Sequence, residues 1–180
     1  DCTATCQYDG IGAFVEYTGP FTKPEESCHL IEYYSVDKLG NTEEVNSQCV
    51  FVDNTPPEGT KEVGQNKVAG DGDPIDWYVN TQTPIYLSCN DPAPHPVNQS
   101  TVHWRFSLWK DEFISPPTYS EWYSELGGQA TVYFNEDSWH DLEFYCEDAL
   151  GNAGPTDTEY FVVDSQAPVI TKEVVGPSEG

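Results

Sequence analysis

The stretch "YYSVDKLGN" at residues 33–41 returns as "FYCEDALGN" at residues 144–152, which is 111 residues later. The same offset takes "TKEV" at 60–63 onto "TKEV" at 171–174. A constant offset between several matching segments marks tandem structural repeats. The sequence therefore predicts a chain built from copies of one unit.

Each copy has the pattern of two strands joined by a turn. In the first copy, residues 30–37 are rich in aromatic and β-branched side chains, which favour strands. The "LGN" at 39–41 supplies the glycine and asparagine that a turn with positive φ requires. Residues 49–54 form the return strand, and the second copy repeats the pattern. The repeated element is therefore predicted to be a β-hairpin.

Proline marks the ends of the copies. "DNTPP" and its counterpart "DSQAP" stop strand pairing, because proline has no N–H to donate to a ladder. These signals place boundaries at about 56–58 and 167–168. The expected organisation is an incomplete repeat at 1–57, a complete repeat at 58–168, and at 169–180 the opening strand of a next repeat or a donor strand to a neighbouring subunit.

The complete repeat has the pattern of a β-sandwich, with short strands separated by turn signals. Strands are predicted near 60–63, 76–80, 84–89, 101–109, 130–134, 141–147 and 158–163. Residues 110–128 are aromatic but interrupted by proline, which predicts a loop or an irregular edge strand, with one helical turn at 120–126 as the alternative for that part.

The complete repeat also carries Cys89, Trp104 and Cys146 in an order that resembles the immunoglobulin-type core. That resemblance implies a disulfide between Cys89 and Cys146 across two sheets, with Trp104 against it. The fold class expected is all-β: immunoglobulin-like (Ig-like) β-sandwich repeats, one complete and one partial at the N-terminus.

The sequence pattern "YTGPFT…IEYYSVDKLGN…FVDNTPP" resembles that of Ig-like repeats found in tandem on bacterial and archaeal surface proteins. The resemblance covers residues 17–57 and, more loosely, 129–168. It implies an extracellular or cell-surface location and a structural role as a stalk, filament subunit or adhesin spacer, without enzymatic activity.

Six cysteines without a zinc-type spacing, in a chain without methionine, indicate disulfides formed in an oxidising compartment. Cys2, Cys6, Cys28 and Cys49 are expected to pair among themselves. A bridge between Cys28 and Cys49 across the hairpin and a bridge between Cys6 and Cys28 both remain open. The sequon at Asn98 is a candidate glycosylation site and agrees with export.

The composition excludes several functions. A formal charge of −24, from 31 acidic and 7 basic side chains, disfavours nucleic acid and anionic membranes as partners and attracts cations. No apolar run is long enough to cross a bilayer, and the start "DCTATC" has no basic leader, so a mature chain or an excerpt is expected. Catalytic motifs are absent, and His29 and His140 share one repeat position, which favours a structural role.

Calcium is the one cofactor that the sequence suggests. "DGDPID" places Asp71, Asp73 and Asp76 in one glycine- and proline-rich loop, and hard cations prefer several such oxygens. Acidic and amide side chains also recur at the turns and boundaries, where calcium would stiffen a linker: Asp37, Asn41 and Asp53, with Asp148, Asn152 and Asp164. The alternative is that all of these are solvated turn residues.

Two surfaces are candidates for binding. Trp109, Tyr119 and Trp122 lie in or beside 110–128, where they would form a stacking platform for a glycan in an adhesin or carbohydrate-binding module. The tail is the counterpart of the first strand of the complete repeat. It is expected to complete the partial repeat of another copy, head to tail, through an assembly strand that carries Val169, Ile170, Val174 and Val175.

Overall fold

The computed structural model describes residues 12–93, 97, 99–173 and 176. These residues form strands and loops only, and no helix among them is long and apolar enough to cross a membrane. The strands are β1 Ser27–Tyr33, β2 Asn46–Val52, β3 Glu58–Val63, β4 Val68–Ala69, β5 Trp77–Val79, β6 Ile85–Asn90, β7 Thr101–Leu108, β8 Thr118–Tyr119, β9 Tyr123–Leu126, β10 Gln129–Val132, β11 Ser138–Glu147 and β12 Asp157–Val163. The fold is all-β, as predicted.

Strands β3 to β12 form a sandwich of two sheets. The smaller sheet has the order β10-β6-β3, and the larger has the order β4-β5-β12-β11-β7-β8, with β9 also paired to β7. Apolar side chains from both sheets meet in one core: Val63, Val79, Ile85, Leu87, Val102, Val132, Phe134, Leu142, Phe144, Phe161 and Val163. All seven strands predicted for this repeat are present.

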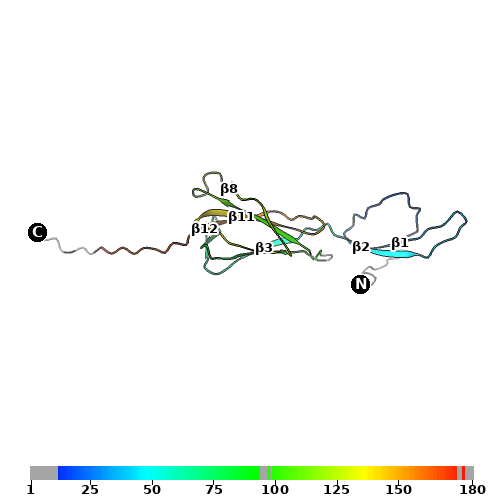
Figure 1. Ribbon diagram of the computed structural model, residues 1–180, viewed down its shortest axis with the longest axis horizontal. Coiled ribbons are helices and arrows are strands. Elements are labelled where there is room, and N and C mark those ends of the chain that lie inside the picture. Colours follow the sequence, from blue (N-terminus) through cyan, green and yellow to red (C-terminus); the bar gives the residue numbers. More distant parts are fainter. Residues whose placement is uncertain (1–11, 94–96, 98, 174–175, 177–180) are drawn as a thin grey trace.

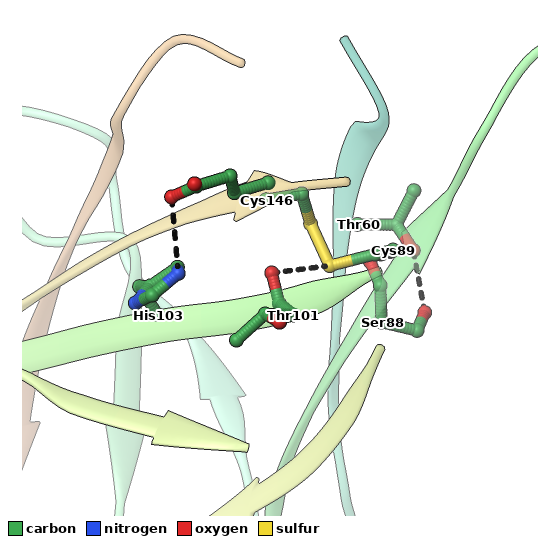
Figure 2. Close-up of a disulfide and its surroundings, with 7 residues drawn as sticks. Thr60, Ser88, Cys89, Thr101, His103 and Cys146 are labelled. Atoms are coloured by element: carbon green, nitrogen blue, oxygen red, sulfur yellow. Dashed lines mark hydrogen bonds and ion pairs between the residues drawn. A yellow bond between two sulfur atoms is a disulfide. The ribbon is translucent and has the colours of Figure 1, made fainter. Parts of the chain in front are cut away.

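A disulfide joins the two sheets. Cys89 on β6 and Cys146 on β11 are bonded, as Figure 2 shows. Their Cα atoms are 5.8 Å apart. Cys146 is 1% exposed, and Trp104 and Cys89 both pack against the core cluster. The sandwich therefore has the covalent link between sheets that the resemblance implied.

The aromatic segment 110–128 contains edge strands and no helical turn. β9 pairs with β7, and Tyr123 stands opposite Trp104 with the two rings stacked 5.7 Å apart. Gly127 and Gly128 follow with positive φ and turn the chain into β10. The predicted irregular edge strand is confirmed, and the alternative of a helical turn at 120–126 is wrong, because the cross-strand ring pair and the glycine turn favour a strand.

The first hairpin repeats the last hairpin of the sandwich position for position. The seven residue pairs of β1 and β2, from Ser27↔Val52 onward, are those of β11 and β12 after the 111-residue shift. The histidines also agree: the Nε2 atom of His29 lies 2.8 Å from the Glu25 carbonyl oxygen, and that of His140 lies 3.3 Å from the Glu136 carbonyl oxygen. The sequence repeat is therefore a structural repeat.

The hairpin differs from its counterpart in what covers it. Phe144 is 3% exposed in the core of the sandwich, whereas Tyr33 at the equivalent position is 52% exposed. Hairpin, sandwich and tail follow one another along the longest axis of the molecule (Figure 1). The linker between β2 and β3 therefore meets one end of the sandwich, and the residues there form the candidate site.

Candidate functional site

The linker after the first hairpin is buried against the sandwich. Asp53 is 7% exposed and the side chain of Pro57 is fully buried. Their counterparts after β12, Asp164 and Pro168, are both exposed. Each copy makes the same local hydrogen bond: the Thr55 N–H donates to the Asp53 carboxylate, and the Gln166 N–H donates to the Asp164 carboxylate. The burial of the first linker therefore comes from the unit that follows it.

The turn between β11 and β12 contacts this linker. Asp148 accepts hydrogen bonds from the backbone N–H groups of Leu150 and Asn152, at 2.8 and 2.9 Å. The Asn152 side-chain amide donates to the Asp148 carboxylate and to the Asp53 carbonyl oxygen, at 2.8 and 3.1 Å. The turn is thus closed by several hydrogen bonds and contacts the linker through the Asn152 side chain.

The turn of the first hairpin is built in the same way. Asp37 accepts from the backbone N–H groups of Leu39 and Asn41 and from the Asn41 side-chain amide. These hydrogen bonds lower the pKa of the Asp37 carboxyl, the side-chain bond from Asn41 most strongly. Asp37 is exposed, while Asp148 is 5% exposed. The same turn is therefore present in both copies, and only the second is covered by a linker.

Close backbone packing at this joint requires a glycine. A Cβ atom at Gly154 would lie 2.8 Å from the carbonyl oxygen of Pro57, a distance that side chains essentially never show. The counterpart of Gly154 in the first copy is Glu43, which is exposed. The small residue therefore occurs in the copy on which a linker packs.

Three carboxylates meet where the linker joins the sandwich. Asp53 comes from the linker, Asp91 directly follows β6, and Asp148 begins the β11–β12 turn. One ligand atom of each lies within 4.8 Å of the others. Oδ2 of Asp53 and Oδ1 of Asp91 are buried and accept no hydrogen bond within the described part of the chain. The cluster thus contains two buried oxygen atoms without a hydrogen-bond partner.

The electrostatics of the cluster are unfavourable as it stands. Burial is the largest cause that raises the pKa of the Asp91 carboxyl, and a hydrogen bond from the Val97 N–H opposes it. The negative charges of Asp53, Asp148 and Glu26 raise this pKa further. The ion pairs found among the described residues lie elsewhere, on Lys61, His103 and Arg105.

Glu26 lies beside the linker and is held there by Thr55. The Thr55 hydroxyl donates to the Glu26 carboxylate at 2.8 Å. The counterpart of Glu26 is Asp137, which accepts a hydrogen bond of 3.0 Å from the Ser165 N–H. An acid at this repeat position therefore contacts the linker at both ends of the sandwich.

The structure does not bring the predicted metal loop together as a site. Asp76 accepts a hydrogen bond from the Tyr160 N–H at 2.8 Å, and Asp71 accepts one from the Asp73 N–H at 3.3 Å. The acidic group close enough to hold an ion, within the described ranges, is the one at the joint. Asp71 and Asp76 therefore each accept a backbone hydrogen bond, and the carboxylates of this loop do not gather into one group.

The predicted glycan platform is divided into two groups. Trp109 is half-buried and packs edge-to-face on Phe113, with ring centroids 5.1 Å apart. Tyr119 and Trp122, each 41% exposed, lie over the Arg105 guanidinium at 4.3 and 4.7 Å. Trp109 therefore packs on Phe113, whereas Tyr119 and Trp122 both contact Arg105 and remain accessible, and glycan stacking stays a prediction.

The remaining predicted residues have mixed outcomes. Val169 and Ile170 are 87% and 93% exposed and belong to no strand. Asn98, Val174, Val175, Cys2 and Cys6 lie outside the described residues. Glycosylation at Asn98 and the assembly strand stay predictions.

Cys28 and Cys49 are both disulfide-bonded. They are not directly opposite, since Cys28 faces Phe51 and Cys49 faces Leu30. Diagonal partners across an antiparallel pair are about 7–8 Å apart at Cα, which is too far for a direct bridge. This register disfavours a bridge between Cys28 and Cys49, and pairing with Cys2 and Cys6 stays a prediction.

The sequence pointed to part of the joint. Asp53 and Asp148 were recognised as recurring residues at boundaries and turns, and both lie in the cluster. Asp91 was missed because it has no counterpart in the first copy, so the repeat gives no signal for it. Glu26 was missed although its alignment with an acid, Asp137, was visible.

Comparisons with known proteins add little to this description. No family model and no curated protein matches the sequence. Among solved structures, the chain is similar to the FN1-FN3 domains of chicken CNTN1, with a TM-score of 0.34 and 12% sequence identity. The match covers 81% of this chain and 46% of that chain, so this chain spans less than half the length of its neighbour. The fold assignment rests on the two sheets, their common core and the disulfide between them.

Proposed function

We propose that this chain is a structural segment of an extracellular fibre, stalk or surface layer, in which Ig-like units are joined end to end by docked linkers. The observation that carries the proposal is the contrast between two copies of one linker. Asp53 and Pro57 are buried by the unit that follows them, while Asp164 and Pro168 are exposed. A linker that becomes buried when a unit follows it suits a stiff rod better than a flexible string of domains.

Tandem linkage fits this proposal better than strand completion does. The tail 169–175 is the counterpart of β3, and β3 pairs with β6 in the sandwich. A docked linker is present between the first hairpin and the sandwich, whereas residues 169–173 of the tail form no strand.

An extracellular setting is supported by the covalent structure. The disulfide between Cys89 and Cys146 spans the core of the sandwich. Such bonds form and persist in oxidising compartments. The strongly acidic surface would keep a long array soluble, because repulsion between negative charges opposes nonspecific association of its units.

Tyr119, Trp122 and Arg105 support a second candidate function. Both rings are accessible and flank a guanidinium on the outer side of the larger sheet. Aromatic rings beside a polar group suit glycan stacking in an adhesin. Binding of oligosaccharides that is lost in Trp122→Ala, with the fold intact, would favour this role.

Adding a further unit to the chain tests the proposal that the units dock end to end. We expect that a chain with a second copy of residues 58–168 inserted after residue 168 is longer by the full length of one sandwich, because each new unit docks on the linker before it. Small-angle X-ray scattering measures the maximum dimension and the cross-section. A rod keeps its cross-section while its length increases; a maximum dimension that grows by much less than one sandwich would contradict end-to-end docking.

A further inference from the structure

We propose that Asp53, Asp91 and Asp148 bind one calcium ion at the joint between the first hairpin and the sandwich. The three side chains come from three separate segments: the linker, the loop after β6 and the β11–β12 turn. One oxygen of each lies within 4.8 Å of the others, which is the spacing of ligands around a shared ion. This inference goes beyond the structural role proposed above.

Burial separates this cluster from ordinary surface acids. Asp53 and Asp148 are 7% and 5% exposed, and two oxygens of the cluster are buried without a hydrogen-bond partner. A buried, unpaired carboxylate is costly, and several like charges close together raise that cost. The described ion pairs bring no lysine or arginine to these carboxylates. A bound cation would supply the missing partner.

The donor set favours calcium over a transition metal. The cluster offers carboxylate oxygens, without a cysteine or histidine in the group. Oxygen-only sites suit hard cations, and calcium accepts irregular arrangements of six to eight oxygens more readily than magnesium does. Glu26 lies outside the group of three acids and is held beside the linker by Thr55.

The position of the ligands determines what the ion would do. Asp53 belongs to the segment that follows the first hairpin, while Asp91 and Asp148 belong to the sandwich. An ion bound by all three would tie the linker to the sandwich and stiffen the joint. The exposed Asp164 at the far end of the sandwich repeats the position of Asp53, so it would form the linker half of the next such site.

The test is calcium binding to the full chain, measured by isothermal titration calorimetry with CaCl₂ after removal of divalent ions. We expect one saturable site with a Kd on the order of 0.1–1 mM, as for extracellular calcium modules. Asp53→Asn and Asp91→Asn should each weaken binding at least about tenfold, since each removes one charged ligand of a shared ion. Asp164→Asn is the matched control, because Asp164 makes the same backbone hydrogen bond as Asp53 but is exposed.

Thermal melting of the same proteins separates a metal site from a merely structural one. In a chelator, Asp53→Asn should melt no lower than the parent, because the change removes one of three repelling charges. Added CaCl₂ should raise the melting temperature of the parent and of Asp164→Asn, and leave that of Asp53→Asn unchanged. A triple Asp71→Asn, Asp73→Asn and Asp76→Asn variant should still bind, and MgCl₂ should bind more weakly than CaCl₂.

The proposal would be overturned if the chain showed no saturable binding up to about 10 mM CaCl₂, a concentration beyond the usual extracellular range. It would also be overturned if Asp53→Asn and Asp91→Asn bound calcium as tightly as the parent. Loss of the site in Asp164→Asn or in the triple variant, or MgCl₂ binding as tightly as CaCl₂, would do the same.

Discussion

Replacing Cys89 and Cys146 with alanine is expected to lower the free energy of unfolding of the sandwich by about 4 kcal/mol. The bond joins residues 57 positions apart, and closing a loop of that length removes much of the conformational freedom of the unfolded chain. It also ties the smaller sheet to the larger one, so its loss affects the whole sandwich.

Chemical denaturation followed by tryptophan fluorescence measures this change. All five tryptophans lie between Trp77 and Trp139, so the signal reports on the sandwich rather than on the first hairpin. Ser88→Ala is the control, since it removes an exposed hydrogen bond between Ser88 and Thr60 beside the disulfide (Figure 2). That control should cost less than about 1 kcal/mol. A loss in the double variant no larger than in the control would show that the bond does not hold the sheets together.

Phe144→Ala is expected to destabilise the sandwich by about 3–5 kcal/mol, because it leaves a cavity in the core. Phe144 is 3% exposed, and its ring lies close enough to Gly59 that an added Cβ there would be 3.1 Å away. The matched variant is Tyr33→Ala, at the same position of the repeat but 52% exposed.

Tyr33→Ala should change the unfolding of the sandwich by less than about 0.5 kcal/mol, as for most surface substitutions. The same fluorescence-detected denaturation compares the two variants. If both aromatic residues cost the same, the two hairpins would be packed alike, and the description of the first hairpin as an uncovered copy would be wrong.

The repeat made most of the fold predictable. The offset between "YYSVDKLGN" and "FYCEDALGN" located both hairpins, and alternating aromatic and β-branched residues located the strands of the sandwich. The repeat and the strand patterns are both visible in the order of the residues, so one sequence is enough to recognise them. For 120–126 the sequence also allowed a helical turn, because its strand depends on a contact of Tyr123 with Trp104 on another strand.

The joint was only partly predictable for a similar reason. Recurrence marked Asp53 and Asp148, but both also fit ordinary turns, and the first copy of the turn, at Asp37, is exposed. What distinguishes them is burial by a following unit and the approach of Asp91, which are consequences of tertiary structure. The run "DGDPID" is more prominent in the sequence, because its three acids lie within six consecutive residues.

The stiffness of the joint is the central claim, and a distance measured across it is the most direct test. Nitroxide labels attached through noncanonical amino acids at Leu39 and Leu126, which are 88% and 83% exposed, leave all six cysteines in place. Pulsed electron paramagnetic resonance, with calcium present, should give one narrow distance distribution. Gly154→Ala should broaden it, because the added Cβ would lie 2.8 Å from the Pro57 carbonyl oxygen and push the linker away. A distribution in the parent chain as broad as that of the variant would contradict a docked joint.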